Sequence, residues 1–199
     1  LKTKLFKMFF SRVDKIKKYI EKLNTKEIKH VKGKSMYDHL VRVSELLSSW
    51  KCEEDFIIAG LCHSLYTTEY FKQEIVSLSK RGEVKNILGD FAEDIIYHFA
   101  IIKRDTFKYS EEEEVYSFTN YVTNQEIEIS GSVGDALAHI LLANDLDHLD
   151  RFTIGYKISW FYKYKNVYSR LSHKAKESLD LIINVENKVA GWKERIYPG

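Results

Sequence analysis

Proline is almost absent from this chain: the only one among 199 residues is Pro198, and glycine occurs only nine times. Since proline and glycine punctuate strands and turns, this scarcity favours a largely helical protein. The length suits one domain with a substantial buried core. We therefore expect an all-α fold, a single helical bundle of about seven to nine helices.

Cysteine, long apolar runs and net charge are also scarce. Cys52 and Cys62 lie inside helical patterns, and two cysteines make no disulfide framework, so we expect reduced thiols in a cytoplasmic protein. No apolar run approaches the roughly 20 residues that span a bilayer. No secretory signal is evident, although a start at Leu1 leaves a trimmed N-terminus open. A formal net charge of +2 gives no case for nucleic-acid binding.

The first 30 residues are far more basic than the rest of the chain. They carry nine lysines and one arginine against three acids, and apolar residues recur at helical spacing from Leu5 to Ile20. We expect residues 1–30 to form a basic amphipathic helix that packs on a domain formed by residues 31–199. The alternative is a surface helix that contacts anionic lipid or an acidic partner.

Apolar spacing predicts further helices along the chain. Met36 to Trp50 mark one helix, and others are expected at about 53–66, 71–80, 83–88, 90–103, 133–150, 155–170 and 172–190. Ser110, followed by four glutamates at 111–114, resembles a capped helix start. The alternation in Glu126–Ile129 predicts a short strand or an extended loop.

Three polar residues, His39, His63 and Asn144, lie on the apolar faces of three different predicted helices. Polar groups in a core are costly unless they are paired or metal-bound, so these residues suggest one buried polar site. Asn144 falls within the apolar arc of its helix. Asp145 lies about 100° further round the helix, so it would reach the buried site only from the edge of the site. His98 is also inward on its helix. Imidazole nitrogens suit Zn, Fe, Mn or Ni.

The order of these residues resembles the HD-domain superfamily of all-α, metal-dependent phosphohydrolases. That pattern is a His, then a His-Asp pair about two dozen residues later, then an Asp on a later helix. His39 and His63 match the two histidines. Ser64 stands at the Asp of the pair, and Asn144 stands at the final Asp, with Asp145 next to it. The resemblance implies an HD-like helical domain.

A closer resemblance is to a subgroup of HD-like proteins of unknown function, which has His-Ser in place of His-Asp. The residues that carry it are Ala59–Tyr66, Thr68-Glu69, Leu88–Glu93 leading to Arg104, and Ala143-Asn144. The HD resemblance as a whole covers about residues 35–149. It implies a shared fold and carries no known reaction for this subgroup.

The two substitutions change the chemistry that the site is expected to perform. In an HD enzyme two carboxylates help to hold the cation and to lower the pKa of a bound water. Ser64 and Asn144 remove two negative charges from that shell. We therefore expect weaker cation binding than in an HD enzyme with both aspartates.

Three functional hypotheses stay open. The first is a metal-dependent hydrolase of a small phosphorylated or anionic molecule, with Zn, Mn or Fe as the cation. Its expected residues are His39, His63, Asn144 and Asp145 for the metal, Glu69 and His98 as general acid or base, and Ser64, Arg81 and Arg104 for the substrate. The second is a degenerate HD domain that binds a small ligand or a protein partner without metal. The third is an interaction module that uses the basic N-terminal helix; the sequence leaves the oligomeric state open.

Overall fold

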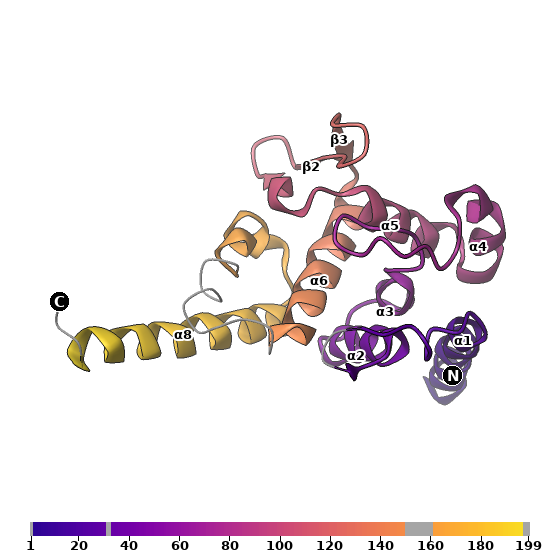
Figure 1. The fold of residues 1–199 in the computed structure, drawn as a ribbon, viewed down its shortest axis with the longest axis horizontal. Helices are drawn as coiled ribbons and strands as arrows, with labels where there is room; N and C mark the ends of the chain where they lie inside the picture. Colours follow the sequence, from indigo (N-terminus) through magenta and orange to yellow (C-terminus); the bar gives the residue numbers. More distant parts are fainter. Residues whose placement is uncertain (1, 31–32, 150–160, 197–199) are drawn as a thin grey trace.

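The computed structural model describes residues 2–30, 33–149 and 161–196, with side chains described between residues 12 and 184. These residues are largely helical (Figure 1). The helices are α1 (Lys2–Lys22), α2 (Met36–Ser49), α3 (Glu54–Cys62), α4 (Arg81–Leu88), α5 (Asp90–Ile101), α6 (Gly131–Asp147) and α8 (His173–Ile196), and the 3-10 segments are η2 (Leu78–Lys80), η3 (Arg104–Thr106) and η5 (Lys163–Arg170). None of the described helices combines the length and apolarity that a membrane span requires.

A small antiparallel sheet corrects the expectation of an all-α fold. It contains β1 (Lys108–Ser110), β2 (Val115–Thr119) and β3 (Glu126–Ile129) in the order β1-β2-β3. β3 is the short strand that the alternating sequence allowed. The sheet forms because Tyr116 and Phe118 of β2 are buried against the helices, so tertiary packing outweighs the helical composition.

The four glutamates at 111–114 form the turn between β1 and β2, so the prediction of a helix start there is wrong. The Ser110 hydroxyl accepts a hydrogen bond from the Glu113 backbone N–H at 3.2 Å, which is a turn contact of the kind that also caps helices. A run of like charges is most stable in water, and the turn places it there.

Two other predicted helices differ from the structure. Residues 71–77 are not helical, because the backbone N–H groups of Ile75 and Val76 donate to the carbonyl of Leu65, in the turn after α3. The helix expected at 155–170 falls partly outside the described residues, and 163–170 is a 3-10 segment.

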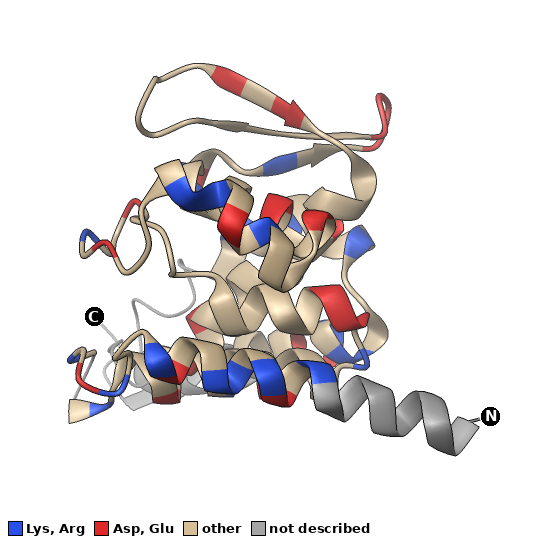
Figure 2. Cartoon of the chain, turned by 90° about the vertical axis from the view of Figure 1, so that its right-hand side faces the viewer, with Lys and Arg blue, Asp and Glu red and all other residues tan. Residues whose placement is uncertain are grey.

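The core lies where α2, α3, α5 and α6 pack together. Ser35 caps α2: its hydroxyl accepts from the Asp38 N–H at 3.1 Å, and Asp38 accepts from the Ser35 N–H at 3.2 Å. Ile16 and Ile20 of α1 are buried in the same core, whereas lysine and arginine positions are spread along this helix in Figure 2. The apolar residues expected from Leu5 to Phe10 lie outside the described side chains.

Candidate metal centre

His39 of α2 and His63, which follows the last residue of α3, meet inside the core. Their Nε2 atoms are 3.1 Å apart, and each residue is 1% exposed. The approach of the two helices depends on Gly60, where an added Cβ would lie 2.2 Å from Leu47 Cδ1. The sequence thus predicted correctly that both histidines face inward, and the structure shows that they touch.

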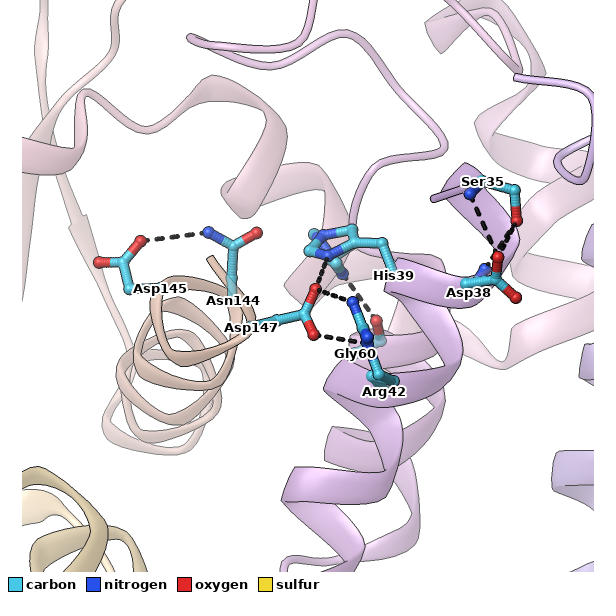
Figure 3. Close-up of polar contacts among 9 residues, drawn as sticks. Ser35, Asp38, His39, Arg42, Gly60, Asn144, Asp145 and Asp147 are labelled. Carbon is cyan, nitrogen blue, oxygen red and sulfur yellow. Dashed lines mark hydrogen bonds and ion pairs between the residues drawn. The ribbon is translucent and has the colours of Figure 1, made fainter. Parts of the chain in front are cut away.

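Hydrogen bonds engage the outer nitrogen of each ring. His63 Nδ1 donates to the Gly60 carbonyl at 2.7 Å, and His39 Nδ1 donates to Asp147 Oδ2 at 2.8 Å (Figure 3). Asp147 is held in turn by Arg42, whose Nε lies 2.7 Å from Asp147 Oδ1. When both Nδ1 atoms carry the proton, the two neutral rings turn Nε2 lone pairs toward each other.

This arrangement matches the way imidazoles surround a cation. Nitrogens that share a cation at about 2.1 Å lie roughly 3.0–3.4 Å apart, depending on the coordination geometry. A carboxylate on the outer nitrogen of a ligating histidine fixes the orientation of the ring, and Asp147 stands in that position on His39. Burial lowers the pKa of His63 well below its usual range, and the nearby His39 ring adds to the shift, so His63 is in the neutral, ligating form.

Two further histidines adjoin His39. His30 precedes α2 and His148 follows α6, and the ring centroid of His39 lies 4.4 Å from His30 and 4.6 Å from His148. In the group His30, His39 and His148, ligand nitrogens all lie within 4.8 Å of one another, so this group could hold a metal ion. His30, His39, His63 and His148 are called the histidine cluster below.

Sequence reasoning did not assign His30, His148 or Asp147 to the site. A signal existed for two of them, because Asp147 and His148 follow Asn144 by three and four residues and therefore share its helix face. His30 lies outside the regular helices, so no periodic pattern marks its side chain. Only the fold brings it to His39.

The side chains of Asn144 and Asp145 have different surroundings in the structure. Asn144 is 3% exposed, its amide donates to Asp145 Oδ1 at 3.2 Å, and in Figure 3 its oxygen points in the direction of His39. Asp145 is engaged elsewhere: its Oδ2 lies 2.7 Å from Lys163 Nζ and accepts from the Tyr164 hydroxyl at 2.6 Å. The carboxylate nearest to His39 is therefore that of Asp147.

Ser64, Glu69 and Arg104 lie on the side of His63. Ser64 is 5% exposed and follows His63 directly. Glu69 Oε2 accepts from the Arg104 backbone N–H at 2.9 Å. The Phe99 ring links this side to the cluster, because it packs edge-on against His63 and also beneath the Arg104 guanidinium.

His98 and Arg81 have other surroundings. His98 Nδ1 donates to the Asp94 carbonyl at 2.8 Å and its ring packs against Phe118 of β2. Arg81 forms two hydrogen bonds with the buried Glu93, at 2.7 and 2.9 Å. In the part of the chain that the structure describes, no hydrogen bond or ion pair joins either residue to the histidine cluster. Their catalytic and substrate-binding roles stay predictions.

Similarity to known proteins covers the first part of this site. Residues 19–104 match DUF6817, a domain of unknown function. This segment includes His30, His39 and His63 but ends before Asp147 and His148. No curated protein and no solved structure matches the chain. The description of the matched family names no HD domain, so the HD resemblance stays a prediction.

Asp147→Asn should weaken metal binding by about 10–100-fold, because it removes the charge that orients the ring of His39 and raises its basicity. Competition titrations of Zn and Mn against a chelating dye would measure the change. Asp90→Asn is the matched control: it removes the same charge from a side chain that is 90% exposed, on α5. Equal affinities in the two variants would contradict the orienting role of Asp147.

Proposed function

We propose that this protein is a metal-dependent hydrolase of a small anionic molecule, with its cation held by the histidine cluster of an HD-like helical domain. The observation that carries the proposal is the 3.1 Å approach of the His39 and His63 Nε2 atoms while both Nδ1 atoms are engaged by oxygen acceptors. Two lone pairs at that distance repel each other unless a proton or a cation lies between them.

The donor set fits a divalent cation of the Zn, Mn or Fe type. Two extra imidazoles, His30 and His148, adjoin His39, and in Figure 3 the Asn144 oxygen points in the direction of His39. These donors offset the two aspartates that Ser64 and Asn144 replace. A cation held by neutral imidazoles keeps its charge and supplies the Lewis acidity that lowers the pKa of water to about 7 in three-histidine zinc enzymes.

The residues around the cluster have positioning tasks. Asp147 holds His39 in one tautomer, and the Gly60 carbonyl does the same for His63. Phe99 and the apolar residues of α3 exclude water from the inner face of the His63 ring. These contacts direct the two Nε2 atoms toward each other as a preorganised pair.

The competing hypothesis is a degenerate domain that binds a ligand without metal. In that case His39 carries a second proton, donates it to His63 Nε2 and forms an ion pair with Asp147. The pair would then be a structural hydrogen bond. The two hypotheses differ in one measurable property, which is metal affinity.

Metal analysis of tag-free protein tests the proposal. We expect the wild type to take up Zn or Mn stoichiometrically, and His63→Ala and His39→Ala to lose at least about tenfold in affinity, because each removes one ligand. His173→Ala, which removes an 84% exposed histidine, should bind like the wild type. His63→Gln, which retains polarity and bulk, covers the case in which the alanine variants do not fold.

Absence of metal uptake by the folded wild type would refute the proposal and favour the metal-free domain. So would variants that are folded and bind metal as tightly as the wild type.

A further inference from the structure

Arg104 is a buried cation that lacks a carboxylate partner among the described residues. The residue is 9% exposed, and its Nε nitrogen is buried without a hydrogen-bond partner. Its backbone N–H is the group that Glu69 holds. The guanidinium lies 4.8 Å from the centre of the Phe99 ring and 5.1 Å from that of Tyr70.

A buried guanidinium is costly unless its charge is paired and its N–H groups are bonded. The two aromatic rings offset part of this cost through cation–π contacts, but they accept no in-plane hydrogen bond from Nε. Asp145 is the buried carboxylate whose pKa responds to Arg104, and it is already bound to Lys163 and Tyr164. No ion pair joins the Arg104 guanidinium to a carboxylate of the described residues, although the Glu69 carboxylate accepts from its backbone N–H.

The Arg104 guanidinium lies beside the histidine cluster. Phe99 contacts both groups, and each is centred 4.8 Å from the middle of its ring, so the guanidinium and the His63 ring cannot be farther apart than twice that distance. A ligand group bound to Arg104 would therefore lie near the His63 ring, with Phe99 in contact with both residues.

We propose that Arg104 anchors an oxyanion, the phosphate or carboxylate group of the ligand, in a subsite next to the histidine cluster. The planar fork of Nε–H and Nη–H groups matches two oxygens of such a group, which supplies the hydrogen bond that Nε lacks and an ion-pair partner for the guanidinium. This inference rests on the proposed function, because it names the chemical group by which the proposed anionic substrate is recognised. The subsite itself is made by Arg104 and needs no metal.

Thermal unfolding in the presence of inorganic phosphate or acetate tests the subsite. Both anions are added to metal-free, full-length protein in a chelating buffer, with chloride at equal ionic strength as reference. A ligand at ten times its Kd should raise the unfolding midpoint of the wild type by roughly 3–5 °C. The anion that gives the larger shift identifies whether a phosphate or a carboxylate is bound.

Arg104→Met separates binding from a structural role. We expect this variant to lose the anion-dependent shift and to be at least as stable as the wild type in chloride, because methionine fills the space without a buried charge. Arg104→Lys keeps the charge without the fork and should keep only part of the shift. Lys72→Met, which removes an exposed cation from the same loop as Glu69, should respond like the wild type.

Three outcomes would overturn the inference: no shift in the wild type with either anion, an equal shift in Arg104→Met, or an equal loss of the shift in Lys72→Met. These outcomes are distinguishable from failure of the proposed function. The anion assay is performed without metal, whereas the proposed function is tested by metal uptake in the His39 and His63 variants.

Discussion

Asp145→Ala should lower the free energy of unfolding by about 3–5 kcal/mol, the cost expected when one partner of a buried ion pair is removed. Asp145 is 3% exposed and binds Lys163 at 2.7 Å and the Tyr164 hydroxyl at 2.6 Å. Burial raises its pKa, but the opposing effects of Lys163 and Arg104 are larger, so the carboxylate is charged. Its removal takes from the buried Lys163 ammonium the carboxylate that it binds in a low-dielectric interior.

Urea denaturation of Asp145→Ala, Lys163→Met and the double variant would measure this effect. The double variant should be more stable than Asp145→Ala, because it also removes the cation whose bound carboxylate the single substitution takes away. Glu177→Ala breaks an exposed ion pair with Lys174 and should leave unfolding essentially unchanged. A loss in Asp145→Ala as small as that in Glu177→Ala would show that the buried pair contributes nothing.

Gly134→Ala should cost about 3 kcal/mol, the upper end of the range for overpacked cores. A Cβ on Gly134 would lie between 2.0 and 2.5 Å from three carbons of the Tyr116 ring. This ring cannot move away readily, because it is fully buried and its hydroxyl donates to Asp135 at 2.5 Å. The added methyl group would therefore push the sheet away from the first turn of α6.

Gly82→Ala is the matched control for the same methyl group on a helix. Nothing lies within 4 Å of a Cβ at Gly82, on α4, so we expect a gain of about 0.4–1 kcal/mol through the unfolded chain. Chemical denaturation of both variants compares them directly. If Gly134→Ala were as stable as Gly82→Ala, the close contact between α6 and β2 would not be a constraint on the fold.

The inward direction of His39, His63 and Asn144 could be predicted because helical periodicity is a local property of the sequence. The choice between Asp145 and Asp147 could not, since it depends on where α6 ends and what lies opposite each carboxylate. Asp145 meets Lys163, which is 18 residues further along the chain, and Asp147 meets His39 and Arg42 of α2. The adjacent acids are therefore sorted by long-range contacts.

The sheet shows a similar division. The alternation of Glu126–Ile129 indicated β3, but Ser110 and the glutamates that follow it carry the same residues as a helix start and become a turn instead. Helix-start and turn contacts share the serine hydroxyl as acceptor, so local chemistry does not distinguish them. The burial of Tyr116 and Phe118 against the helices decides in favour of the strand and its turn.

By itself, the sequence of this protein determined its main helices, the Ser35 cap of α2 and the inward faces of its two central histidines, because these depend on neighbours within a few residues. Only the tertiary structure decided that His30 and His148 join them, that Asp147 is the carboxylate on His39 and that Arg104 is buried without an ion-pair partner among the described residues. Those features arise from segments far apart in the chain, and the energy that selects them is that of desolvated charges and hydrogen bonds formed by packing.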